Sequence, residues 1–301
     1  MKKSLLIAAG LASFAIADAS AEIDFYGKGN VSLEAVSEGD ADTSELRSNR
    51  SRIGIKGSEP INESLQAIYQ LEYQVTIDDS TTFSQRNIFI GVKGDFGTVQ
   101  AGHFDTPLKQ VQNKVDLFND LRGDINNVVT YNDNRASNSV MYTSPVLGDV
   151  FQGYVDYINS EDEDVDAGVS VALTFTLDQL YIALAADENV EQEDASALRL
   201  VMQYQFDRIQ LGLLAEESET AGGESESGVM ASIGFKLNEK VDLKVQAGQS
   251  DIVEQGGETV SLGADYKLTK QVKTFAFYTR ESADNDALDN DYLGVGLEVA
   301  F

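Results

Sequence analysis

The sequence ends on DYLGVGLEVAF, residues 291–301, and this stretch decides the fold. Counted back from the last residue, every second side chain from Phe301 to Leu293 is apolar, and the residues between them are small or polar apart from Tyr292. A period of two is the pattern of a β-strand with one apolar and one polar face. Chain ends are usually frayed and polar, so a strand complete to its last residue must pair along its whole length.

The same period of two recurs along most of the chain. It is clear in residues 23–34, 65–77, 169–177, 198–206, 229–237, 241–247 and 260–268. We predict 16 strands, starting near residues 23, 46, 64, 85, 98, 138, 149, 166, 180, 197, 209, 228, 241, 259, 272 and 291. Short turns such as LNEK and LTKQ alternate with long acidic runs such as NSEDEDVD and DENVEQEDAS. This alternation predicts an up-and-down meander with two unlike rims.

The front of the chain indicates export. Lys2 and Lys3 precede an apolar run from Leu5 to about Ala17, and small residues in an A-x-A pattern follow, ending at Ala21. We interpret residues 1–21 as a secretory signal peptide and residues 22–301 as one β-barrel domain. No later segment approaches the 18 apolar residues that a membrane helix needs.

Composition narrows the class of protein further. The chain has no cysteine, so it is not held by disulfides, and its formal net charge is −28. Phosphate binding needs a basic face, so nucleic acid is excluded as a partner. We predict no cofactor and no metal. The acidic runs could bridge weakly to divalent cations, although a solvated loop explains them as well.

Two architectures fit alternating strands. A soluble sandwich packs its apolar faces together, whereas a transmembrane barrel turns them to lipid and keeps its polar face on the lumen. The export signal, the high even strand count, the alternating connections and the complete last strand favour the barrel. Residues 291–301 then form the closing strand, and Phe301 lies in an aromatic girdle at the membrane interface. We therefore predict an all-β, 16-stranded antiparallel transmembrane β-barrel, wide enough for an aqueous channel.

One connection breaks the regular pattern. It runs from about residue 104 to residue 137, FDTPLKQVQNKVDLFNDLRGDINNVVTYNDNRAS. Loops of this length in a compact domain usually carry function.

Several segments resemble the general diffusion porins of Gram-negative bacteria: SRIGIKGSE (51–59), NIFIGVKGDFGTVQAGHFDTP (87–107), NSVMYTSP (138–145) and the terminal Phe301. The resemblance implies a trimeric sixteen-strand barrel in the outer membrane, reached through the signal peptide. It implies that the 104–137 loop folds inward as a constriction loop. It also implies contacts with neighbouring subunits, outer-membrane lipid and lipopolysaccharide.

In this family, acidic residues on the inward loop face basic residues on the wall. Arg52 of SRIGIKGSE and Arg86, before NIFIGVKGDFG, match family wall arginines; the facing of Arg86 rests on resemblance alone. Arg50 and Arg52 have the opposite parity to Ile53, so they point to the lumen if Ile53 faces lipid. Lys28 likewise has the opposite parity to the apolar residues of its own strand, so it also points to the lumen if they face lipid. The candidate site residues are the basic Lys28, Arg50, Arg52 and Arg86, the acidic Asp116, Asp120 and Asp124, and Tyr292 and Phe301 of the closing strand. The motif does not say which aspartate faces the pore.

Two positions depart from the family pattern. Met141 stands where many relatives have arginine, and His103 stands where arginine is also common. In a pore about as wide as the screening length of about 8 Å, fixed charges set ion selectivity. The missing wall charge and the acidic composition predict a modest cation preference in a channel for ions and small hydrophilic solutes.

Other functions remain as alternatives. The barrel could be specific for one substrate, or could be a non-conducting adhesin or structural anchor. A soluble secreted β-enzyme is a further possibility. We do not expect an enzyme, because His103, the one histidine, has no nucleophile or metal cluster beside it in the sequence.

Overall fold

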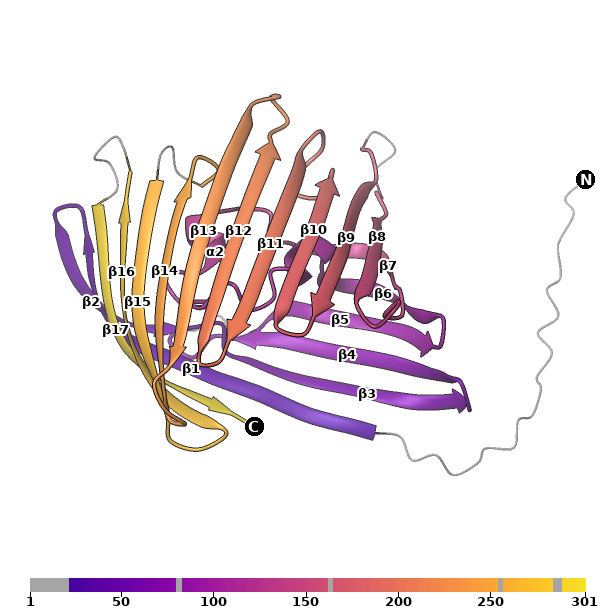
Figure 1. Cartoon of the computed structure of the whole chain (residues 1–301), viewed down its shortest axis with the longest axis horizontal. Helices are drawn as coiled ribbons and strands as arrows, with labels where there is room; N and C mark the ends of the chain where they lie inside the picture. The colour runs from indigo at the N-terminus through magenta and orange to yellow at the C-terminus, as the bar shows by residue number, and fades with distance from the viewer. Residues whose placement is uncertain (1–21, 80–82, 162–164, 254–256, 284–288) are drawn as a thin grey trace, which may run out of the picture.

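The computed structural model describes residues 22–79, 83–161, 165–253, 257–283 and 289–301, so the predicted signal peptide lies outside the described residues. These residues form one strongly curved antiparallel sheet with two four-residue helices on its concave side (Figure 1). The elements are β1 Glu22–Glu38, β2 Ala41–Ser48, β3 Arg52–Asn62, β4 Leu65–Val75, β5 Phe83–Gly94, β6 Gly97–Asp105, α1 Pro107–Gln110, α2 Ile125–Val128, β7 Arg135–Thr143, β8 Phe151–Ile158, β9 Gly168–Leu177, β10 Leu180–Glu188, β11 Ser196–Phe206, β12 Ile209–Glu219, β13 Ser225–Lys236, β14 Val241–Ser250, β15 Gly257–Lys267, β16 Val272–Ser282 and β17 Asp289–Ala300.

The sheet closes on itself through its first and last strands. β17 pairs with β16 on one side and with β1 on the other, where Lys28 lies opposite Ala300 and Glu38 opposite Asn290. Phe301 continues this pairing, because its N–H donates to the Gly27 carbonyl at 3.0 Å and its carbonyl accepts from the Gly27 N–H at 2.9 Å. The predicted barrel and closing strand are confirmed, and the seam leaves no free edge between the two chain ends.

The second predicted strand is interrupted. β2 pairs with the second half of β1 and β3 with its first half, so the two occupy one strand position and the barrel is sixteen-stranded. The strand predicted to start near residue 46 begins at Ala41 and is interrupted at residues 49–51. Side chains compete with the ladder here: Asn49 Nδ2 donates to Ser32 Oγ at 2.9 Å, and Ser51 Oγ donates to the Asn30 carbonyl at 3.0 Å.

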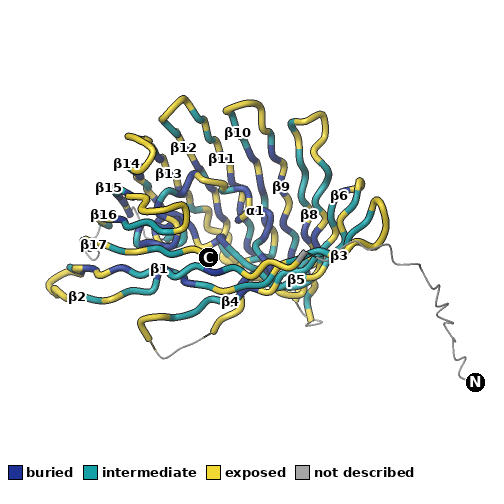
Figure 2. Tube along the Cα trace, turned by 90° about the horizontal axis from the view of Figure 1, so that it is seen from below, coloured by how far each residue is buried: buried dark blue, intermediate teal, exposed yellow. Residues whose placement is uncertain are grey.

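The two faces of the sheet differ as the alternation predicts. In β17, Leu293, Val295 and Leu297 are 59%, 56% and 43% exposed, whereas Tyr292, of the opposite parity just before them, is 4% exposed. Exposed and buried positions alternate in the same way along β9 to β13 (Figure 2). The exposed apolar side chains face outward and the buried polar ones face inward. An apolar outer belt on a closed sheet of hydrogen-bonded strands suits a bilayer.

The connections are unequal, as predicted. Two residues join β9 to β10 and β11 to β12, whereas residues 106–134 separate β6 from β7. The long connection is therefore slightly shorter than its predicted bounds. No helix in the described ranges is long and apolar enough to cross a membrane.

Candidate functional site

The 106–134 loop packs along the inner face of the barrel wall. Ser170 Oγ of β9 accepts from the Leu108 N–H at 3.2 Å, Ser232 Oγ of β13 donates to the Val115 carbonyl at 2.6 Å, and Ser250 Oγ of β14 donates to the Val129 carbonyl at 2.7 Å. Inward hydroxyl groups of three strands thus form hydrogen bonds with backbone groups of the loop, which would otherwise need water as their partner. These bonds hold the outgoing and returning halves of the loop against the wall.

Small wall residues let the loop approach closely. A Cβ at Gly228 would lie 2.7 Å from the Val129 carbonyl oxygen, and one at Gly212 would lie 2.9 Å from Val115 Cγ1. Val111, Val115 and Val129 are at most 1% exposed and pack with inward apolar side chains of the wall, among them Val201, Leu214 and Met230. The wall that carries the loop is consequently apolar as well as hydroxylated.

Asp120 at the loop tip lies among three basic residues of the wall. Its carboxylate pairs with Lys28 of β1, lies 3.5 Å from Arg52 Nη2 of β3 and lies 3.9 Å from Arg50 Nε. Burial alone would raise the pKa of Asp120, but these cations outweigh it and hold the pKa below its ordinary value. Asp120 is therefore the loop aspartate that lies within 4 Å of all three of these basic residues.

Arg50 reaches the loop because of the break between β2 and β3. Its φ of 48° lies in the left-handed region, which few residues other than glycine adopt. The guanidinium lies 3.9 Å from both Asp120 Oδ1 and Asp124 Oδ2. The parity argument from Ile53 does not hold for Arg50, since the residue lies outside both strands.

The other two predicted aspartates organise the loop itself. Asp124 caps α2 by accepting from the Asn126 N–H at 2.9 Å, and it accepts from the Asp120 N–H at 2.7 Å. Asp116 accepts from the Phe118 and Ile125 N–H groups at 2.9 and 3.1 Å. Burial and the nearby Asp124 charge raise the pKa of Asp116 to about 7. Asp116 makes no ion pair with a described residue.

Arg86 lies on the inner face but away from the loop tip. Its Nε donates to Glu72 Oε1 of β4 at 2.7 Å, and both side chains are nearly buried. A register shift between β4 and β5 at Leu71 and Tyr73 changes the parity beside Arg86. This bulge explains why the apolar pattern of NIFIGV could not show which way Arg86 points.

The two predicted closing-strand residues have different surroundings. The Phe301 ring is 66% exposed and covers Gly27, where a Cβ would overlap it. Tyr292 points inward and its ring lies 4.3 Å from the guanidinium of Arg122, a loop residue.

The sequence prediction missed several charged residues of the inner face. Glu34 of β1 is fully buried and pairs with Arg122, Glu72 pairs with Arg86, and Arg135 Nε lies 2.9 Å from Asp105. The parity of Glu34 within β1 was the one signal that could have identified it, since it matches Lys28. Loop residues such as Arg122 have no periodicity to read.

A cavity of about 490 Å³ opens on the lumen side between the loop and strands β4 to β8. Its lining includes Asn87, Gln100, Thr143 and Tyr154 of the wall and Gln110 of the loop. The loop therefore covers one side of the barrel interior, and polar and apolar side chains together line open space on the other.

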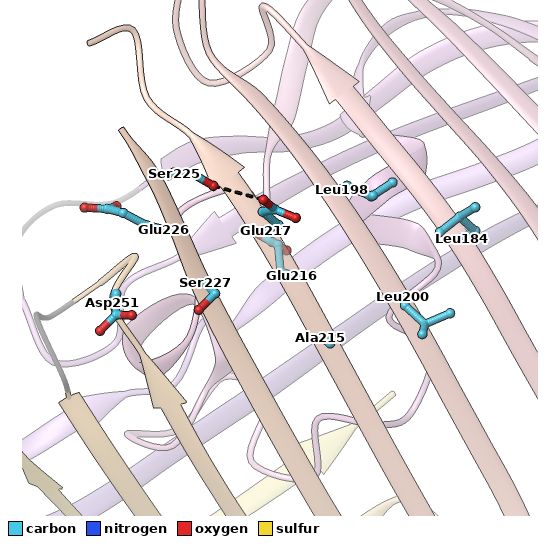
Figure 3. A pocket seen from close by; sticks show the side chains of 10 residues that line it. All are labelled: Leu184, Leu198, Leu200, Ala215, Glu216, Glu217, Ser225, Glu226, Ser227 and Asp251. Carbon is cyan, nitrogen blue, oxygen red and sulfur yellow. Dashed lines mark hydrogen bonds between the residues drawn. The ribbon is translucent and has the colours of Figure 1, made fainter. Parts of the chain in front are cut away.

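A second cavity, of about 640 Å³, lies toward one end of β10 to β13 (Figure 3). Leu184, Leu198 and Leu200 line it from the outward apolar face, and Ser225 Oγ donates to Glu217 at 3.0 Å. It lies on other strands than the Asp120 cluster, so we do not assign it to the lumen site. Within the described ranges no group of three or more His, Cys, Asp or Glu residues could hold a metal ion.

The fold and this geometry define a class: a transmembrane β-barrel whose interior is partly filled by one of its own loops. The model of the Gram-negative porin family matches residues 4–286. The chain belongs to this family and is accordingly an outer-membrane protein.

Curated relatives agree with this membership, and solved structures agree with the fold. The chain is 34% identical to a major outer membrane protein P.IB of Neisseria gonorrhoeae over 128 residues, which cover 39% of this chain and about a third (36%) of that protein. A P.IB protein of Neisseria meningitidis serogroup B is 26% identical over the full length of both chains. Among solved structures, an anion-selective porin from Comamonas acidovorans matches with a TM-score of 0.79 at 17% identity, covering 94% of this chain and 100% of that one.

Proposed function

We propose that the chain forms a water-filled channel for passive diffusion of ions and small hydrophilic solutes across the outer membrane. The observation that carries the proposal is the cavity between the loop and β4 to β8, lined by polar and apolar side chains, inside a barrel too wide for wall side chains to fill. The loop narrows this channel, and the cluster of Lys28, Arg50, Arg52 and Asp120 forms one side of the constriction.

We propose a modest cation preference. Each wall cation of the cluster has a carboxylate nearby: besides Asp120, Glu298 lies 3.9 Å from Lys28 and Asp124 lies 3.9 Å from Arg50. Arg86 is matched by Glu72 in the same way. Since these basic residues are compensated, the acidic runs in the long connections at the channel mouth set the sign of the field that an entering ion meets. The anion selectivity of the Comamonas porin is a property of that protein and does not set the sign for this chain.

We also propose that the chain assembles as a homotrimer in contact with outer-membrane lipid and lipopolysaccharide. Family membership and the trimer form described for a Vibrio cholerae outer-membrane neighbour support this proposal.

Planar-bilayer recording of purified, refolded protein tests the channel. Stepwise conductance in groups of three supports a trimeric pore, and liposome swelling with sugars of increasing size gives its exclusion limit. A substrate-specific channel would instead saturate with one solute. A folded, heat-modifiable barrel without conductance would support an adhesin or anchor and overturn the proposal.

A further inference from the structure

Arg122 joins the loop tip to the strands at which the barrel closes. Its Nε donates to Glu34 Oε2 of β1 at 2.8 Å, and its Nη2 pairs with Glu45 of β2. The same guanidinium lies 4.3 Å from the centre of the Tyr292 ring of β17. One loop side chain thus contacts three wall strands, two of which form the seam between the chain ends.

The contacts of Arg122 are stronger than those of an ordinary surface pair. Glu34 is fully buried, and the Arg122 side chain is 19% exposed. A carboxylate buried to this degree needs a charged donor, because an unpaired buried charge is costly. Burial alone would lower the pKa of Arg122, but Glu34 and Glu45 outweigh it and raise the pKa.

Apolar packing supports the same part of the loop. Phe118 and Leu121 are buried against Val36 of β1 and against Phe275 and Phe277 of β16. Arg122 follows this cluster directly in the chain, so its ion pairs determine where the end of an already packed segment can lie.

The tip carries two opposite charges that meet two opposite charges on one strand. Asp120 pairs with Lys28 and Arg122 pairs with Glu34. Lys28 and Glu34 lie six positions apart on β1, roughly 20 Å along a strand. A tip shifted along β1 would bring like charges together, so the arrangement fixes both the position and the direction of the tip.

We propose that Arg122 is the positioning residue that sets the width of the pore. It holds the loop tip against the strands beside the β1–β17 seam through its contacts with Glu34, Glu45 and Tyr292. This inference rests on the proposed channel function. Without these contacts the loop tip can move into the lumen or away from it, so the pore no longer has one fixed cross-section.

The barrel itself should tolerate the loss of Arg122. Arg47 of β2 also acts electrostatically on Glu34 and Glu45, so the two carboxylates keep one cation nearby. The strand pairing of the seam involves no loop residue. A variant at Arg122 therefore tests the position of the loop more than the closure of the sheet.

The experiment compares wild type, Arg122→Gln, Arg122→Lys and Lys114→Gln in planar bilayers and in liposome swelling. Lys114 is the matched control, because it lies in the same loop, carries the same charge and makes no ion pair with a described residue. We expect Arg122→Gln to change the single-channel conductance by up to about twofold, broaden its distribution and admit larger sugars, because the sixteen-strand lumen is wider than the held constriction. Arg122→Lys should restore the wild-type values in part, and Lys114→Gln should match wild type.

The outcomes separate this inference from the channel proposal. If wild type conducts and Arg122→Gln keeps its conductance, its narrow distribution and its sugar limit, the inference is overturned. If wild type itself does not conduct, the channel proposal fails instead. Glu45→Gln gives a second test if Arg122→Gln does not yield a heat-modifiable barrel, since Glu45 is 43% exposed and is dispensable for packing. It should change the conductance in the same way, and a wild-type value would overturn the inference.

Discussion

Replacing Asp120 with asparagine should shift the channel toward anions. Asp120 is the carboxylate shared by Lys28, Arg50 and Arg52, and its side chain is 3% exposed, whereas theirs are 15–29% exposed. The three cations thus form the exposed surface of the cluster, and the aspartate buried beneath them lowers the net charge of the cluster by one. Without it, the cluster gains one uncompensated positive charge.

The size of the effect follows from Coulomb's law. A unit charge about 4 Å from a passing ion in water is worth about 1 kcal/mol. A Debye length of about 8 Å reduces this to about 0.6 kcal/mol at 0.15 M salt. Each ion's local concentration then changes about threefold in opposite directions, so we expect the cation-to-anion permeability ratio to fall about five- to tenfold.

The assay is the reversal potential across a KCl gradient for wild type, Asp120→Asn and Asp178→Asn. Asp178 is the matched control, since it removes the same charge from the exposed turn between β9 and β10. A ratio for Asp120→Asn equal to that of the control would refute the assignment of Asp120 to the constriction.

Three further predictions concern the packing of the 106–134 loop against the barrel wall and the inner face of the wall itself. Because burial raises the pKa of Asp116 to about 7, the seated loop binds a proton more tightly than the released one. The contribution of Asp116 to the packing of the loop is therefore full below about pH 4 and is lost as pH rises through about 7; open-channel noise should grow more over this range in wild type than in Asp116→Asn. Gly228→Val should displace Val129 and cost about 1–3 kcal/mol, seen as a lower temperature of heat modification; Gly222→Val is the control, because a Cβ there would meet only Thr220 Oγ1, at an ordinary contact distance of 3.7 Å. Asp187 of β10 is buried and makes no ion pair with a described residue; Ser170 is its side-chain hydrogen-bond partner. Asp187→Asn should therefore raise the heat-modification temperature at pH 8 by about 2–4 °C if about 1 kcal/mol is relieved, and a lowered temperature would contradict this reasoning.

The sequence predicted the barrel because its signal is local and repeated. Alternation within each strand shows which face meets lipid, and the complete strand at 291–301 indicates closure. Lys28 and Arg52 were predicted to point inward by the same parity, and the structure places both beside Asp120.

The sequence could not predict what breaks or lies outside the period. Side-chain bonds of Asn49 and Ser51 interrupt a strand and redirect Arg50, and a bulge turns Arg86 toward Glu72. In the loop, the distinct roles of Asp116, Asp120 and Asp124 depend on contacts with strands more than a hundred residues away or near the start of the chain. Such contacts are tertiary and leave no periodic trace.

The most direct test of this account is the reversal potential of purified wild-type protein in a planar bilayer across a KCl gradient. The account predicts stable conductance steps and a potential of modestly cation-selective sign. An anion-selective sign would contradict the charge balance drawn from Asp120, Asp124 and Glu298, and the absence of conductance from a folded barrel would contradict the channel itself.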